Sequence, residues 1–162
     1  MSSPAAISTK LGTFIGWFSG TGLARLDLPG KACKSKVIPK PSGLANPSLA
    51  ATATALESLL LGQAPQKLPL LYLSCATEFQ QSVWRQILKI PPGQTCSYGE
   101  IARRLEKPGA SRAVGSACAA NPIPVIIPCH RVLPAHRHIG GFSGGRGWKQ
   151  RLLRIEGAKF IE

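Results

Sequence analysis

The sequence has few acidic residues and lacks the cysteine spacings that build cross-linked or zinc-bound domains. Seven Asp and Glu residues stand against 20 Lys and Arg residues, which gives a formal net charge of +13. The five cysteines form an odd set without a C-x-x-C pair. This pattern argues against a disulfide framework and against a zinc ribbon or finger. We therefore expect reduced thiols and no structural metal.

Long apolar segments are also missing. No apolar run approaches the roughly 20 residues of a membrane span, and no long basic amphipathic helix is present. Residues 1–9 lack the basic start and the apolar core of a secretory signal. We expect no membrane partner and an intracellular location, which is the cytoplasm and nucleoid in a prokaryote or the nucleus in a eukaryote.

The excess of positive charge indicates a polyanionic partner. An excess of this size is typical of proteins that bind nucleic acid. The alternative is that the cations only keep the surface soluble or reflect the proteome of the host. Composition does not decide between the two.

The 162 residues can form one ordinary domain or two small ones. Residues 11–28 alternate imperfectly around four glycines, which predicts two or more short strands of an antiparallel sheet. Residues 34–47 are rich in proline and lysine and predict a loop. Residues 48–61 predict a helix with an apolar face, and Gly62 is available to end it.

A linker at residues 62–67 places the predicted domain boundary near residue 70. The expected domains are a small α/β unit over residues 1–70 and a second unit over residues 71–162. The second unit begins with an extended segment at residues 70–74. Thr77 and Gln80 have the spacing of a capping box, and the helix that follows over about residues 78–90 has one broad buried face.

Two shorter helices are predicted at residues 98–105 and 110–119, joined by a turn that contains Pro108 and Gly109. This is the pattern of a helix-turn-helix, and the second helix carries mainly small side chains, including Ala113, Gly115 and Ser116. It offers only Arg112 for reading base edges. We expect close backbone contact in the minor groove of double-stranded DNA without sequence specificity. The alternative is that the small residues pack against the core.

The strongest chemical signal is the sequence IPCHRV at residues 127–132, which follows the stiff turn NPIP at residues 121–124. A thiol reacts as a thiolate, and His130 and Arg131 are candidates for the base or the positive charge that would activate Cys129. A buried Cys-His pair with a purely structural role is the alternative.

Five motifs in this order closely resemble the O6-alkylguanine-DNA alkyltransferases. They are SY at 97–98, SRAVG at 111–115, NPIP at 121–124, IPCHRV at 127–132 and GFSGG at 141–145. The resemblance runs from about Thr77 to Phe160 and more weakly through residues 12–16 and 22–26, which are similar to the family's first strands. It implies an amino-terminal ribonuclease-H-like α/β domain and a mostly helical carboxy-terminal domain with the helix-turn-helix.

The resemblance assigns the catalytic residues. Cys129 would take the alkyl group from O6 of guanine irreversibly, and His130 would act as its base through a bound water. Glu156 matches the carboxylate that orients the histidine, and Asn121 matches the residue that braces the active-site turn. Tyr98 matches the phenol that donates to the departing guanine and helps to rotate the nucleotide.

The resemblance also assigns the contacts to substrate and DNA. Substrate contacts are expected from Tyr98, Val132, Phe142 and Ser143, of which Ser143 lies in the loop that binds O6. DNA contacts are expected from Arg112, Ala113, Gly115 and Ser116, with Arg112 filling the gap left by the flipped nucleotide. The segment 133–140 carries no strong family signature, so its role stays open.

No cofactor is implied, and the protein is expected to act as a monomer that reacts once, because no second cysteine is placed to regenerate Cys129. Some relatives hold zinc in the amino-terminal domain, but that half has only Cys33 and Cys75 and no histidine. One alternative is a lesion-binding protein without the cysteine, against which Cys129 argues. The other is a thiol hydrolase, disfavoured because adjacent side chains on an extended segment point to opposite faces.

Overall fold

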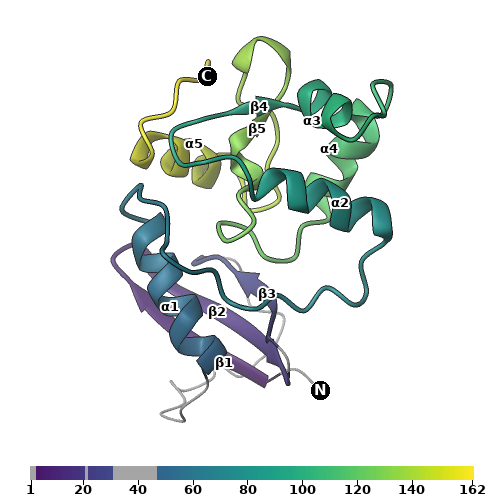
Figure 1. Ribbon diagram of the computed structural model, residues 1–162. Coiled ribbons are helices and arrows are strands. Elements are labelled where there is room, and N and C mark those ends of the chain that lie inside the picture. The colour runs from purple at the N-terminus through teal and green to yellow at the C-terminus, as the bar shows by residue number, and fades with distance from the viewer. Residues whose placement is uncertain (1–2, 21, 31–46) are drawn as a thin grey trace.

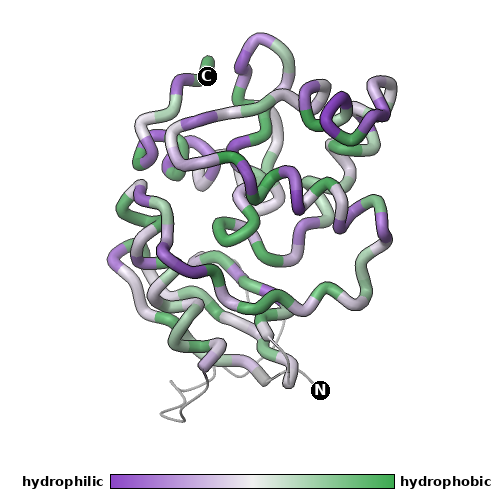
Figure 2. The backbone as a smooth tube through the Cα atoms, in the orientation of Figure 1, coloured by the Kyte–Doolittle hydropathy of each residue, from purple (hydrophilic) through white to green (hydrophobic). Residues whose placement is uncertain are grey.

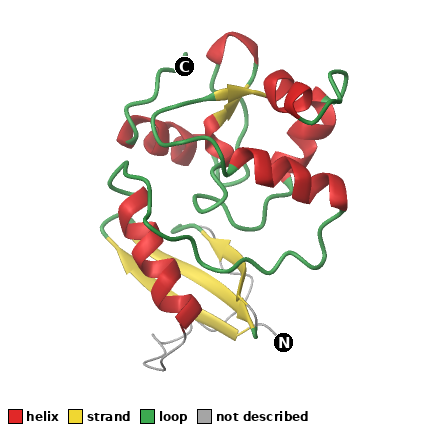
Figure 3. Ribbon diagram, in the orientation of Figure 1, coloured by secondary structure: helices red, strands yellow, loops and turns green. Residues whose placement is uncertain are grey.

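The computed structural model describes residues 3–20, 22–30 and 47–162. A sheet and one helix form the lower part of the molecule, and the remaining helices form the upper part (Figures 1 and 3). The loop expected at residues 34–47 lies outside the described residues except for Pro47, and Cys33 lies outside them as well. In the described ranges, no helix is both long and apolar enough to cross a bilayer.

Three antiparallel strands in the order β1-β2-β3 build the lower sheet. They are β1 (Ser3–Thr9), β2 (Gly12–Ser19) and β3 (Gly22–Asp27). The two strands expected within residues 11–28 are confirmed, but they are the second and third strands. Strand β1 was not predicted, because its small and polar residues give little alternation and it becomes a strand by pairing with β2.

Helix α1 (Pro47–Leu59) packs on this sheet and buries Thr52, Ala55, Leu56 and Leu59. It begins one residue before the predicted start, because proline is accepted at the first helical position. It ends two residues before the predicted end, where the Gly62 amide donates to the carbonyl of Leu59 at 3.0 Å. Gly62 has a φ of +74°, so the predicted stop residue does close the helix.

The upper part begins with α2 (Glu78–Ile87), and the predicted capping box of Thr77 and Gln80 is present. The helix ends three residues before the predicted residue 90, which closes a turn onto the carbonyl of Ile87. Helices α3 (Tyr98–Arg104) and α4 (Ser111–Ala119) lie within one residue of the predicted ranges. They pack against each other as the expected helix-turn-helix pair.

Five elements of the upper part were not predicted. Strands β4 (Cys96–Ser97) and β5 (Val132–Leu133) pair in parallel, and two 3₁₀ turns cover Cys129–Arg131 (η1) and Ala135–Arg137 (η2). Helix α5 (Arg146–Ile155) follows the GFSGG loop. Strands of two residues carry no periodicity that a sequence pattern can reveal.

The hydrophobic core is continuous between the two parts of the molecule. Leu23, Leu26 and Leu28 of the lower part belong to the same buried cluster as Trp84 and Val114 of the upper part. Hydrophobic segments accordingly occur in both parts of the chain in Figure 2. The boundary between residues 1–70 and 71–162 remains a prediction.

Candidate active site

Cys129 lies at the start of a 3₁₀ turn and is 3% exposed. The turn is preceded by a strained segment, because the buried Val125 has a φ of +74°. A β-branched residue in this region costs about 1–3 kcal/mol and persists only where the surroundings impose it. The amide of Ile127 donates to the carbonyl of Ile123 at 2.9 Å, which closes this turn.

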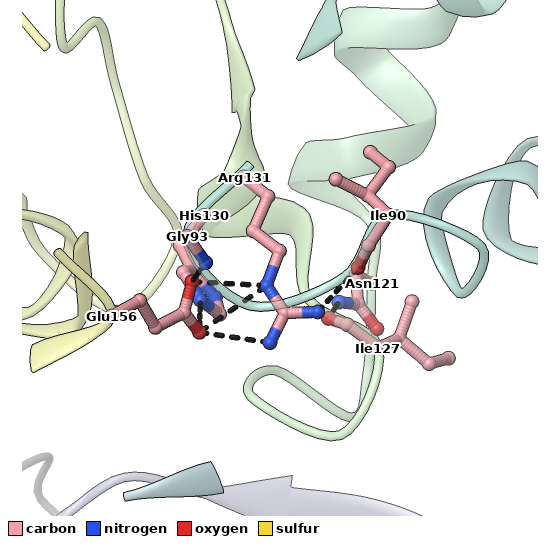
Figure 4. A network of polar contacts seen from close by, with 7 residues as sticks. All are labelled: Ile90, Gly93, Asn121, Ile127, His130, Arg131 and Glu156. Carbon is pink, nitrogen blue, oxygen red and sulfur yellow. Dashed lines mark hydrogen bonds and ion pairs between the residues drawn. The ribbon is translucent and has the colours of Figure 1, made fainter. Parts of the chain in front are cut away.

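Asn121 connects the turn to the thiol. Its Nδ2 donates to the carbonyl of Ile127 at 2.9 Å and to Cys129 Sγ at 3.0 Å, while its Oδ1 accepts from the amide of Ile123 at 2.9 Å. One side chain thus fixes both ends of the turn and the sulfur, and Figure 4 shows its contact with Ile127. The amide donor also stabilises a thiolate over the neutral thiol.

His130 and Arg131 converge on the carboxylate of Glu156 at the end of α5 (Figure 4). His130 Nε2 lies 2.9 Å from Glu156 Oε1, and Arg131 donates through Nε and Nη2 to both carboxylate oxygens at 2.8–3.2 Å. Arg131 Nη1 also donates to the carbonyl of Ile90 at 2.5 Å. All three side chains are buried, with 1–4% of their surface exposed.

The charges in this cluster follow from its contacts. Burial alone would raise the pKa of Glu156, but the hydrogen bonds from His130 and Arg131 and their charges lower it to about 2. Burial lowers the pKa of His130 below its usual value, although Glu156 opposes this. At neutral pH the cluster therefore holds an ionised Glu156 and a neutral His130.

His130 uses its Nε2 to bind Glu156, so only its Nδ1 is available to accept a proton. Its Nδ1 is buried and has no hydrogen-bond partner within the described part of the chain. The expectation that residues 129 and 130 lie on an extended segment was wrong, because η1 is a 3₁₀ turn. The imidazole is nevertheless occupied by Glu156 on its Nε2 side, which leaves only Nδ1 to exchange a proton with the thiol.

Lys149 is a buried cation that the sequence analysis missed. It is 1% exposed, and its Nζ donates to the carbonyls of Val132 at 3.0 Å and Gly141 at 3.1 Å. Burial lowers the pKa of Lys149 to about 8, while the neighbouring thiols Cys129 and Cys118 act to raise it. The signal was its helical spacing, because Lys149 shares one face of α5 with Leu152 and Leu153.

A cavity of about 330 Å³ opens onto the thiol. Its walls come from α3, α4, η1 and the GFSGG loop, and the lining residues are Tyr98, Gly115, Cys118, Ala119, Cys129, Gly141, Phe142 and Ser143. Tyr98, Phe142 and Ser143 were expected to contact substrate. Val132 is not part of this lining; it is fully buried, and its carbonyl accepts from Lys149. Cys118 was not expected here.

The thiols and the phenol in the cavity hold their protons tightly. Burial raises the pKa of Cys129 to about 11, although the hydrogen bond from Asn121 and the charge of Lys149 act to lower it. Burial raises the pKa of Tyr98 and that of Cys118 to about 12. Tyr98 is therefore a hydrogen-bond donor at neutral pH, and Cys129 needs a base to react.

Helix α4 presents small side chains to solvent beside this cavity. Arg112, Ala113 and Ser116 are exposed, and Gly115 is half-buried against the ring of Tyr98. The alternative that the small residues only pack against the core is wrong for Ala113 and Ser116. The segment 133–140, to which the sequence assigned no role, contains η2. In η2, His136 and Arg137 are exposed and have φ values of 62° and 61°.

The chain is similar to proteins of one family. Residues 78–158 match the DNA-binding domain of 6-O-methylguanine DNA methyltransferase. A methylated-DNA--protein-cysteine methyltransferase of Mycobacterium leprae is 54% identical over 82 residues, which cover 51% of this chain and 50% of that protein. One of Methanosarcina acetivorans is 50% identical over 82 residues, or 51% of this chain and 53% of that protein. The matching segment spans about half the length of these relatives.

A solved structure extends the similarity to the lower part of the molecule. The Mycobacterium tuberculosis OGT in complex with DNA superposes with a TM-score of 0.79 at 34% identity. The superposition covers 95% of this chain and 92% of that chain. The mixed α/β fold is therefore shared over nearly the whole chain.

Proposed function

The chain belongs to the 6-O-methylguanine DNA methyltransferase family, and from this premise we propose that it repairs O6-alkylguanine in DNA by moving the alkyl group to its own Cys129. The observation that carries the proposal is the buried thiol at the wall of a cavity, held by Asn121 and followed by the His130 and Glu156 pair. The activity is that of a methylated-DNA--protein-cysteine methyltransferase, which is the name of the curated relatives.

The reaction begins with the proton of Cys129. His130 Nδ1 takes it through one water molecule, and the imidazolium that forms is stabilised by the ionised Glu156. Arg131 keeps the carboxylate ionised and fixed, so Glu156 does not take the proton itself. Lys149 and the Asn121 amide stabilise the developing thiolate.

The thiolate then attacks the carbon attached to O6 of the flipped guanine. The new S–C bond forms as the C–O bond breaks, and the electron pair of that bond passes to the purine. Tyr98 donates a hydrogen bond to the departing base, and groups of the Ser143 loop bind O6, which makes guanine a better leaving group. The purine anion then takes up one proton, which replaces the thiol proton given to His130, through the hydrogen-bond donor Tyr98 and water. The products are unmodified guanine in DNA and an S-alkylcysteine that none of the described residues is placed to reverse.

The DNA partner is bound through the helix-turn-helix. We propose that α4 enters the minor groove, where Ala113, Gly115 and Ser116 allow close approach without reading sequence. Arg112, at the start of the exposed face, fills the gap left by the flipped nucleotide. The supporting observation is that this face is exposed and borders the cavity through Gly115 and Ala119.

The remaining proposals concern the whole protein. The three antiparallel strands followed by α1 support a ribonuclease-H-like assignment for the amino-terminal unit. We propose a monomer that works inside the cell on double-stranded DNA and uses no cofactor, because the thiol and its proton relay suffice for the transfer.

The test is the mass of the intact protein after incubation with a short duplex that contains O6-methylguanine. We expect a gain of one methyl group, about 14 Da, that stops at one equivalent and is absent in Cys129→Ser. Cys75→Ser is the matched control, because Cys75 is exposed and lies away from the cavity.

Two other outcomes point to other functions. Tight binding of the lesion without a mass gain would indicate a lesion-binding protein. Turnover of a thioester or ester beyond one equivalent, dependent on Cys129, would indicate a thiol hydrolase.

A further inference from the structure

The end of β3 connects the two walls of the cavity, although it belongs to the other part of the molecule. The amide of Leu26 donates to the carbonyl of Pro122 at 2.9 Å, next to the Asn121 that holds Cys129. Two residues later, the buried Leu28 lies against the GFSGG loop, which forms the opposite wall. A smaller space of about 190 Å³ separates residues 25–28 from Asn121 and Ser143.

The contact between Leu28 and the loop is close. A Cβ added to Gly144 would overlap with Leu28 Cδ1 on one side and with the Phe142 ring on the other. The loop backbone thus rests directly on the leucine methyl group, and glycine is the residue that this approach allows. Phe142 lines the cavity, so the position of Leu28 is transmitted to the substrate wall.

Helix α5 makes a second contact with the segment that contains Leu28 and Pro29. Trp148 Nε1 donates to the carbonyl of Pro29 at 3.3 Å, and the Trp148 ring packs edge-on against Phe14 of β2 at 5.8 Å. Lys149 follows directly and holds the carbonyls of Val132 and Gly141. The loop is therefore held at its amino end, Gly141, by Lys149 and near its carboxyl end, Gly144, by Leu28, while Trp148 joins α5 to Pro29.

From these contacts we infer that Leu28 is a positioning residue for alkyl transfer, which holds the loop of residues 141–145 at the distance from Cys129 that a bound guanine requires. The inference rests on the proposed function. Through this residue the amino-terminal unit takes part in the reaction: Leu28 is not among the residues that line the cavity, and its effect passes through Gly144 and Phe142.

The test compares Leu28→Ala with Leu56→Ala, a substitution of the same size at a fully buried position on α1. With O6-benzylguanine as the probe, we expect Leu28→Ala to raise the concentration for half-maximal rate about fivefold to tenfold. Leu56→Ala should change it less than twofold at a similar drop in melting temperature. Equal shifts in both variants, or none in Leu28→Ala, would overturn the inference.

Two further measurements separate positioning from loss of folding. Gly144→Ala should impair the reaction, and adding Leu28→Ala should restore part of it by making room for the new methyl group. Additive losses would contradict the proposed contact. Amide hydrogen exchange of residues 141–145 should be faster in Leu28→Ala than in Leu56→Ala, and equal exchange would also contradict it.

These results can be told apart from failure of the proposed function. If the unmodified chain gains neither a benzyl group from O6-benzylguanine nor a methyl group from the O6-methylguanine duplex, alkyl transfer fails. The hydrogen-exchange comparison still decides whether Leu28 fixes the loop. If the unmodified chain reacts and Leu28→Ala reacts equally well at every concentration, only the positioning inference fails.

Discussion

At the scale of single residues, Glu156 determines the electrostatics of the site. One carboxylate serves both His130 and Arg131, and all three side chains are buried. A buried ion pair that loses one partner leaves an uncompensated charge, which costs about 3–5 kcal/mol. The arrangement thus couples the stability of the fold to the protonation of the site.

Acid should destabilise the protein in two stages. Burial lowers the pKa of His130 below 6.5, so the unfolded chain binds the proton first and stability falls as the pH drops below about 6.5. Burial alone would raise the pKa of Glu156, but its partners lower it from 4.5 to about 2, so its contribution is complete above pH 4.5 and is lost toward pH 2.

Urea unfolding at a series of pH values measures this dependence. Glu156→Gln should be less stable by about 3–5 kcal/mol at pH 7, because Arg131 stays buried without its partner. The variant should also lose the part of the pH dependence between 4.5 and 2. Identical slopes in both proteins over that range would show that Glu156 is not the titrating group.

At the scale of elements, α3 and α4 differ: α3 has a stabilising capping box, whereas α4 exposes the residues proposed to contact DNA. Helix α3 is fixed by the capping box of Ser97 and Glu100, whose backbone hydrogen bonds lower the pKa of Glu100. Helix α4 has no side-chain cap and exposes its small residues. The exposed side chains of α4 are therefore not needed to cap the helix and are available for contact with DNA, as proposed above.

Arg112→Ala tests the role of α4 in flipping. We expect at least a tenfold loss of the repair rate on duplex DNA and less than a twofold change with the free base O6-benzylguanine, because only the duplex needs the gap filled. The measurement is the single-turnover rate on both substrates. Equal losses on both would mean that the arginine supports the fold.

At the scale of the whole molecule, only some of the cationic side chains behind the net charge of +13 should contribute to DNA binding. Arg103, Arg104 and Lys107 are exposed on and beside α3, near the exposed Arg112 of α4. Helix α5, whose sequence includes Arg151 and Arg154, lies on the opposite side of the upper part from α3 and α4 in Figure 1. Only the first group borders the proposed DNA surface.

The salt dependence of DNA binding measures how many cations take part. With about four phosphate contacts, affinity should fall about a hundredfold between 50 and 200 mM salt. Arg104→Ala should reduce the slope by about one contact, and Arg151→Ala should leave it unchanged. A flat salt response would remove the electrostatic argument for binding.

Alkylation should destabilise the whole fold. A group added to Cys129 projects into the cavity and should crowd the lining side chains of Tyr98 and Phe142, and overpacking of this kind costs about 1–3 kcal/mol. At about 2–4 °C per kcal/mol, the melting temperature of the fully alkylated protein should fall measurably. An equal or higher melting temperature after complete alkylation would contradict this expectation.

Elements whose signals are local could be predicted from the amino-acid sequence. The capping box at Thr77, the helix-turn-helix at residues 98–119 and the motif around Cys129 depend on neighbours in the chain, and the structure has them nearly as expected. Strand β1, the β4 and β5 pair and the buried Lys149 depend on partners far along the chain. No local pattern specifies such partners.

The assembly of the site became visible in the folded chain. The fold placed Glu156 against Arg131 as well as His130, put Cys118 in the cavity and removed Val132 from its lining. It also brought Leu28 of the amino-terminal unit against Gly144. The physical reason is that hydrogen bonds and packing act between groups that are close in space, whereas a sequence pattern shows only which groups are close along the chain.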